Sequence, residues 1–307
     1  MNDNIIKYQT AFNNVIDRLK NNESVLAVMV FGSMVTGDLW EESDIDLFVV
    51  TNEDIKVEKI YTQEEDVPIH VKIIDKKNLD KIYQCDLRGG KTHRIFASSR
   101  LVFSKDSSIS SWYDRGRYYP DIDRERWNLV YLGEIFKYIG VCKKYLKNRG
   151  FYTAYSDSVK LTEAFSKLYV NFSGYMISKD VINMATSLDD DFKNIVDDLF
   201  FNTDNIEESI IKLIEYIKIY LNDNIRNITS LLLNYMKEKD TFLSSQDILM
   251  DDLFKCYSIS MEDILEYSIS MEDILEYLYY KNIIKKHSRK LKNKKGELIF
   301  QENVYFI

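Results

Sequence analysis

Two aspartates, Asp44 and Asp46, stand beside apolar residues where an apolar run that ends at Val50 begins. On a strand, residues i and i+2 share a face, so we expect the two carboxylates to lie side by side. Two negative charges at that distance repel each other unless a cation lies between them. Oxygen ligands on a rigid strand suit Mg²⁺, which keeps waters and takes further ligands from substrate phosphates. The pair therefore predicts a metal site that serves phosphate chemistry.

A glycine and a serine, Gly32 and Ser33, end the preceding apolar run over residues 25–31. A tight turn after a buried strand offers backbone N–H groups and one hydroxyl to an anion. We therefore expect Gly32 and Ser33 to contact the phosphates of a nucleoside triphosphate. Two bound metal ions would clamp the attacking and leaving oxygens of a phosphoryl displacement.

The order Gly32-Ser33, ten residues, then Asp44-Ile45-Asp46 between apolar strands resembles the nucleotidyltransferase signature of the DNA polymerase β superfamily. The resemblance implies an α+β nucleotidyltransferase domain with a mixed sheet. It also implies Asp44 and Asp46 as metal ligands, Mg²⁺ (or Mn²⁺) as the cofactor, and a nucleoside triphosphate, ATP first, as the substrate. The competing interpretation, a surface turn, is disfavoured because unpaired charge beside apolar residues is costly. Ser43 is a further candidate nucleotide-binding residue.

The third position of this site is open. The superfamily usually places a third Asp or Glu on a strand that we predict over residues 69–75, and this strand offers His70, Lys72 and Asp75. His70 is the candidate catalytic base, because its pKa suits proton abstraction near neutral pH. Asp75 is the third acid if the strand is shifted or bulged. In the remaining alternative the third acid is missing and the activity is weak or lost.

Four basic residues are candidate phosphate ligands outside this core. Arg88, Lys91 and Arg94 lie in a Gly-containing turn that enters a helix, which is equally typical of a solvated helix start. Lys179 ends a Gly-x-x-x-x-Lys turn similar to one in antibiotic adenylyltransferases, where the lysine reaches toward nucleotide phosphates. The alternative is that Ser178 caps the next helix and Lys179 is simply exposed.

Hydrophobic periodicity divides the chain into three parts. A helix over residues 4–20 and strands at 25–31, 44–50, 57–61, 69–75 and 100–103 form the nucleotidyltransferase domain, residues 1–115. A polar stretch, 104–123, marks the boundary. Residues 116–240 read as a helical, substrate-binding-like domain, an antiparallel bundle with helices at 124–147, 152–177 and two or three more between 189 and 239.

The tail, residues 241–307, has a winged-helix pattern: helices at 245–256 and from 261 or 271 to 286, then a hairpin of 298–300 and 304–306. It contains an exact repeat of ten residues, 257–266 and 267–276. Ten residues rotate a helix by about 280°, so the copies cannot share one apolar stripe. The three-part order resembles the YgxA-type nucleotidyltransferase-like proteins, which have a C-terminal helix-turn-helix. The matching stretches are 69–71, 94–103 and the segment from 275 through the wing.

The distribution of charge in the tail disfavours DNA binding. Residues 281–295 are basic, but acidic residues fill the preceding helices, which would enter the groove. We therefore expect a packing or dimer-forming module, in which acidic helices pair with the basic wing of a neighbour in a homodimer. Nucleic acid as a partner is not favoured.

Composition bounds the remaining possibilities. The 307 residues are 45% hydrophobic and carry a net charge of −8, which gives no general attraction to nucleic acid or anionic membrane. Three scattered cysteines argue against a zinc site and a disulfide scaffold. The absence of a signal peptide and of a membrane-spanning run predicts a cytoplasmic protein without a membrane partner. The frequent Lys, Asn, Ile and Tyr are typical of an AT-rich bacterial genome.

Three functions are consistent with these features. The first is metal-dependent transfer of a nucleoside monophosphate from a triphosphate to an acceptor hydroxyl on a small molecule, RNA or protein. The second is a catalytically weak or inactive nucleotide-binding, regulatory protein. The third is a toxin that modifies tRNA, since several such toxins share this signature.

Overall fold

The structure, a computed structural model, describes residues 2–37, 39–54, 58–85, 91–202, 204–254, 270–292 and 295–307. Arg88 and the first copy of the repeat, 257–266, lie outside these residues. The described residues up to Tyr119 form one compact unit, and those from Pro120 onward form another. The division at 115/116 and 240/241 stays a prediction.

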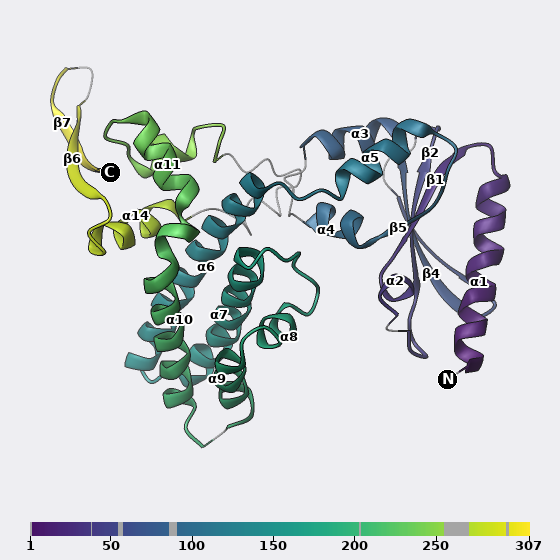
Figure 1. The fold of residues 1–307 in the computed structure, drawn as a ribbon, viewed down its shortest axis with the longest axis horizontal. Coiled ribbons are helices and arrows are strands. Elements are labelled where there is room, and N and C mark those ends of the chain that lie inside the picture. The colour runs from purple at the N-terminus through teal and green to yellow at the C-terminus, as the bar shows by residue number, and fades with distance from the viewer. Residues whose placement is uncertain are drawn as a thin grey trace. The chain divides into compact units, whose positions relative to one another are not determined.

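The first unit is built on a mixed five-stranded sheet in the order β3-β4-β2-β1-β5 (Figure 1). The strands are β1 (Val25–Phe31), β2 (Ile45–Thr51), β3 (Glu58–Glu64), β4 (Val67–Asp75) and β5 (Arg100–Ser104). β2 and β4 run parallel, whereas the other neighbouring strands are antiparallel. β1 and β2 lie in the middle and are apolar on both faces, as expected of strands covered on both sides. The predicted α+β fold with a mixed sheet is confirmed.

Helices cover both faces of this sheet (Figure 1). One face packs on α1 (Asn2–Asn21) through its apolar stripe: Tyr8, Ala11, Phe12, Val15 and Ile16. The opposite face carries α3 (Lys76–Cys85), α4 (Lys91–Ser98) and α5 (Ser107–Gly116), which contribute Leu79, Phe96, Ile109 and Tyr113. The short helix α2 (Ser33–Thr36) follows β1 directly.

The predicted polar boundary, residues 104–123, contains helix α5, and the two compact units divide within it, between Tyr119 and Pro120. The apolar residues Ile109, Trp112 and Tyr113 of α5 recur at i, i+3 and i+4, so they form one stripe that packs on the sheet. Asp106 caps the helix by accepting a hydrogen bond from the Ser108 backbone N–H at 2.9 Å. The polar residues of this stretch are therefore the cap and the solvent face of a helix.

The second unit is a helical bundle followed by a hairpin. Its bundle helices are α6 (Asp121–Lys147), α7 (Phe151–Phe172), α8 (Val181–Thr186), α9 (Asp190–Phe201), α10 (Ile206–Ile228) and α11 (Ser230–Lys239). Buried Asn171 of α7 donates to the side chain of Asn128 on α6 at 2.8 Å, which fixes the register between these two helices. No described helix is both long enough and apolar enough to cross a bilayer.

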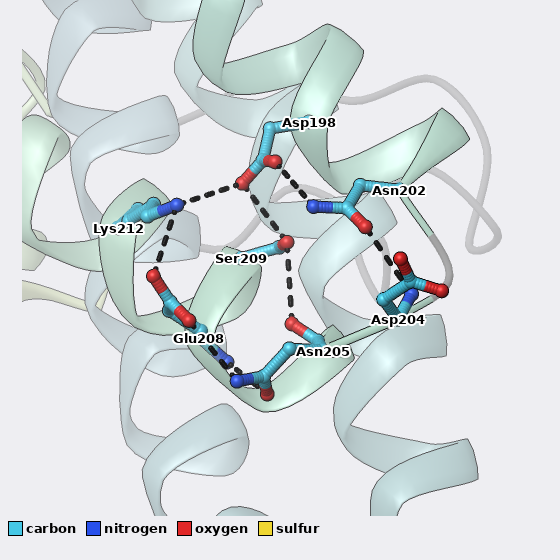
Figure 2. A network of polar contacts seen from close by, with 7 residues as sticks. All are labelled: Asp198, Asn202, Asp204, Asn205, Glu208, Ser209 and Lys212. Atoms are coloured by element: carbon cyan, nitrogen blue, oxygen red, sulfur yellow. Dashed lines mark hydrogen bonds and ion pairs between the residues drawn. The ribbon is translucent and has the colours of Figure 1, made fainter.

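A polar network closes the connection between α9 and α10 (Figure 2). The Asp198 carboxylate accepts hydrogen bonds from Asn202 at 2.8 Å and Ser209 at 2.9 Å, and it pairs with Lys212 at 3.4 Å. Asn205 caps α10 by accepting from the Glu208 backbone N–H. The hydrogen bonds from Asn202 and Ser209 lower the pKa of Asp198. The contacts of this cluster therefore join α9 to α10.

The described residues of the tail include α12 (Ser245–Leu249), α14 (Met271–Tyr280) and a hairpin of β6 (Lys285–Lys292) and β7 (Leu298–Phe306). The prediction of a turn between residues 300 and 304 is wrong, because β7 is continuous and pairs with the basic stretch that follows α14. The interpretation as a winged helix stays a prediction. Tyr277 packs against Phe136 of α6 with ring centroids 4.7 Å apart, which joins the tail to the bundle.

Two acidic residues of α14 are paired within the chain. Glu276 forms an ion pair with Lys286 of β6, and the buried Tyr305 hydroxyl lies 2.8 Å from Glu272 and 2.9 Å from Glu276. Lys286 lowers the pKa of Glu276 by a hydrogen bond. The pairing of acidic helix with basic wing that we expected between two copies therefore forms, at these residues, in one copy.

Candidate functional site

Strand register brings the candidate catalytic side chains to one place. Asp46, at the beginning of β2, lies opposite Phe31 at the end of β1 and opposite His70 on β4. Asp44 directly precedes β2. Asp46 and His70 share the sheet face of Phe48 and Ile74, which pack under α3, α4 and α5. The site thus lies where that covered face ends.

The three side chains converge on one point. Nδ1 of His70 lies 2.5 Å from Oδ2 of Asp44 and 3.9 Å from Oδ1 of Asp46. One ligand atom from each residue lies within 4.8 Å of the others, so the three could hold a metal ion. The side chains are 42% (His70), 34% (Asp44) and 22% (Asp46) exposed, so a solute can reach them. Among the residues that the structure describes, these three form the group whose ligand atoms lie close enough together to hold a metal ion.

Gly32 makes close contact with this cluster. Its φ is +73°, and a Cβ added to it would lie 2.6 Å from Oδ2 of Asp46. Every other residue type would therefore be strained at this position and would push Asp46 away. The Ser33 hydroxyl donates to the Asp44 backbone oxygen at 3.3 Å, which ties the turn to the start of β2. The Gly32-Ser33 turn therefore contacts both acids, and the space beside Asp46 at Gly32 is one that any side chain would fill.

Ser43 belongs to the loop before Asp44. It is buried, its hydroxyl accepts from the Trp40 backbone N–H at 3.0 Å, and its carbonyl accepts from the Tyr8 hydroxyl at 2.5 Å. Burial raises the pKa of Tyr8, and the negative charge of Asp44 adds to this effect. Tyr8 thus helps to position the loop that carries Asp44. Its only sequence signal was its place in the apolar stripe of a helix, so its polar contact was missed.

Asp75 lies far from the acids. β2 and β4 pair without a shift, with Asp46 opposite His70 and Thr51 opposite Asp75. Asp75 is the fifth residue after His70 along β4, about 17 Å away at about 3.3 Å per residue. Asp75 is buried and accepts from the Asn78 backbone N–H at 2.9 Å. Burial alone would raise its pKa, but the hydrogen bonds from Asn78 lower it. The alternative that makes Asp75 the third acid is wrong.

An aromatic residue that the sequence did not single out packs against His70. Tyr61 of β3 lies opposite His70 in the β3–β4 pair, and the two rings meet edge to face with centroids 4.6 Å apart. Tyr61 is 69% exposed. Strand alternation would have revealed this neighbour only once the register of β3 on β4 was known.

The four basic candidates belong to three different parts of the chain. Arg94 lies half-buried on α4 and Lys91 begins that helix, while Arg88 and the Lys91 side chain lie outside the described part. Lys179 is exposed, and belongs to the second unit. Asp180, not Ser178, caps α8, since it accepts from the Asn183 backbone N–H. The phosphate-binding roles of these residues stay predictions.

Comparisons with known proteins agree with the fold of the first unit. Residues 13–108 match the family model described as polymerase beta, nucleotidyltransferase. A nucleotidyltransferase-like protein from Exiguobacterium sibiricum 255-15 has a similar structure, with a TM-score of 0.64 at 12% identity, over 97% of this chain and 99% of that chain. At this identity the similarity concerns the fold. A search of curated proteins gives no match.

Proposed function

From a first domain that belongs to the polymerase β-type nucleotidyltransferase superfamily, we propose that this protein transfers a nucleoside monophosphate from a nucleoside triphosphate to an acceptor hydroxyl. The observation that carries the proposal is the convergence of Asp44, Asp46 and His70 beside the Gly32 turn. The acceptor is a hydroxyl of a small molecule, an RNA or a protein.

The donor set fits a divalent cation. Two carboxylates whose charges repel each other are stabilised by a cation between them, and exposure leaves room for waters and phosphate oxygens. Asp44 and Asp46 would hold Mg²⁺ or Mn²⁺. When bound, the ion would stabilise negative charge on the reacting phosphate and make the acceptor hydroxyl more acidic.

The reaction itself is a displacement at the α-phosphorus. The acceptor oxygen loses its proton and forms a bond to phosphorus, the bond to the bridging oxygen of the β-phosphate breaks, and pyrophosphate leaves. Gly32 lets the phosphate-binding turn approach Asp46, and Ser33 holds that turn to Asp44. Gly32, Ser33 and Ser43 are the proposed nucleotide-binding residues of this unit, and ATP is the first triphosphate to test.

Transfer of label from α-³²P nucleoside triphosphates tests the proposal. The full-length protein is incubated with each triphosphate, Mg²⁺ or Mn²⁺ and a panel of acceptors, and labelled acceptor and pyrophosphate are measured. Asp46→Asn keeps the shape of the side chain but removes its charge, so we expect transfer to fall by on the order of 100-fold. The matched control is Asp54→Asn, since Asp54 is an exposed acid beyond the opposite end of β2. Equal activity of Asp46→Asn and wild type would refute the assignment.

A second function, nucleotide binding without turnover, is favoured by one observation. A histidine occupies the position beside the two acids where a third carboxylate would complete an all-oxygen site. In that case wild type binds the metal–triphosphate complex in titration calorimetry, Asp46→Asn does not, and no acceptor is labelled. Both functions thus require binding of the metal–triphosphate complex, and only the first transfers label to an acceptor.

A further inference from the structure

We propose that His70 is itself a ligand of the divalent cation, through Nδ1, and that it makes the site select a first-row transition cation over Mg²⁺. The inference rests on the proposed function, because it concerns the same ion. It replaces the role of His70 as a base acting through Nδ1 with a role in metal choice.

Nδ1 lies close enough to both carboxylates to share one ion with them. Ligands at right angles around an ion with bonds of about 2.1 Å lie about 3 Å apart, and ligands on opposite sides lie about 4.2 Å apart. Nδ1 lies 2.5 Å from the Asp44 carboxylate and 3.9 Å from the Asp46 carboxylate. All three ligand atoms can therefore surround one ion after small rotations of the side chains.

The neighbouring strands hold the imidazole toward the acids. His70 lies in the interior of β4, with Asp46 opposite on β2 and Tyr61 opposite on β3. The edge-to-face contact with Tyr61 occupies one side of the ring, and Nδ1 faces Asp44. A ring held in this way needs little reorganisation to become a ligand, as metal sites require.

The chemistry of the donors then decides which cation binds best. Mg²⁺ prefers oxygen ligands in near-octahedral geometry, whereas an imidazole nitrogen favours first-row transition cations. A site of two carboxylates and one imidazole is therefore less suited to Mg²⁺ than a site of three carboxylates. Mn²⁺ binds most weakly of the first-row series, so it gains least from the nitrogen ligand. A preference for Mn²⁺ over Mg²⁺ is therefore the most stringent test of this inference.

Metal binding to the full-length protein tests it without an acceptor. Mn²⁺ and Mg²⁺ affinities are measured by titration and by competition, in wild type, His70→Asp and His70→Gln. We expect the ratio of Mn²⁺ to Mg²⁺ affinity to fall about tenfold in His70→Asp, because the nitrogen ligand becomes an oxygen ligand. Pulsed EPR of bound Mn²⁺ should show coupling to one imidazole ¹⁴N in wild type and none in either variant.

The control is His287→Gln, which removes another of the three histidines, from the hairpin. It should keep both the affinity ratio and the ¹⁴N coupling. Mn²⁺ binding without ¹⁴N coupling, or an unchanged ratio in His70→Asp, overturns the role of His70 but leaves the proposed function intact. Absence of any Mn²⁺ or Mg²⁺ binding in wild type overturns both.

Discussion

At the scale of single residues, the contact between Gly32 and Asp46 leads to a sharp prediction. Gly32→Ala places a Cβ 2.6 Å from Oδ2 of Asp46 and must displace that carboxylate. We expect affinity for the divalent cation to fall about tenfold or more, because the proposed ligand Asp46 is moved. Titration calorimetry with Mn²⁺ measures this.

Gly37→Ala is the control for the effect of backbone strain in the same turn. Gly37 also has a positive φ, +85°, but nothing lies within 4 Å of its added Cβ. The αL backbone of Gly37 (ψ 4°) costs an alanine about 1–2 kcal/mol, and Gly32 (ψ −150°) lies in a region essentially restricted to glycine, where the strain is larger. Only Gly32→Ala also disturbs Asp46. Equal loss of metal affinity in the two variants would show that strain, and not the contact with Asp46, is responsible.

The sequence predicted the site residues that lie close together in the chain. Asp44, Asp46, Gly32 and Ser33 could be identified because strand alternation and a Gly-Ser turn are local patterns. The choice between His70 and Asp75 depended on the register of β4 on β2, which no local pattern encodes. Tyr8 and Tyr61 were missed for the same reason, since each acts through a partner on another element.

At the scale of elements, the cap of α5 predicts a pH dependence of stability. Asp106 pairs with Lys76 at 2.5 Å and caps the helix, and the hydrogen bond from Lys76 lowers the pKa of Asp106 from 3.8 to about 2. Because the folded-state pKa is lowered, the contribution is complete above about pH 4 and is lost as pH falls toward 2.

Asp106→Asn keeps the acceptor for Ser108 but removes the charge. We expect the variant to be less stable than wild type by about 1–2 kcal/mol at neutral pH, a value discounted for the partial exposure of the ion pair. The difference should shrink as pH falls below 4. Urea unfolding at several pH values measures it, with Asp54→Asn as the control. A difference independent of pH would mean that the charge of Asp106 does not contribute.

Elements were predictable where apolar spacing is regular. The sheet strands and the long bundle helices follow from periodicity, and their ends differ from the predictions by a few residues. Helix α5 was hidden because polar residues surround a short stripe. The hairpin was misplaced because β6 is rich in basic residues and largely exposed, so it shows no alternation of apolar and polar residues.

At the scale of the whole molecule, the internal pairing of α14 with the hairpin bears on self-association. Glu276 is paired with Lys286, and Glu272 lies beside Tyr305. Before these charges could pair between two copies, the ion pair and the hydrogen bond within each copy would have to break. We therefore expect the mass measured by light scattering to be the same at low and high salt. A mass that falls from dimer to monomer as salt is added would contradict this and support the charge-paired homodimer.

The same pairing predicts how the tail responds to charge changes. Glu276→Lys places two like charges together against a buried tyrosine hydroxyl, so we expect a loss of about 1–3 kcal/mol in the stability of the second unit. Lys286→Glu in the Glu276→Lys background should recover part of it. Thermal unfolding of the single and double variants measures both effects. No recovery in the double variant would mean that the two residues do not act as a pair.

The parallel pairing of β2 with β4 has a consequence for folding. Asp46 and His70 are neighbours in the sheet, but the whole of β3 lies between them along the chain. An ion held by both would close that loop, as a reversible cross-link does, and would bind only the chain in which the loop is already closed. Such an ion, present at 100 times its dissociation constant, would stabilise the first unit by about 2.7 kcal/mol. The cation would then stabilise the fold as well as take part in the reaction. Its removal by a chelator would lower the stability of the first unit by the same amount.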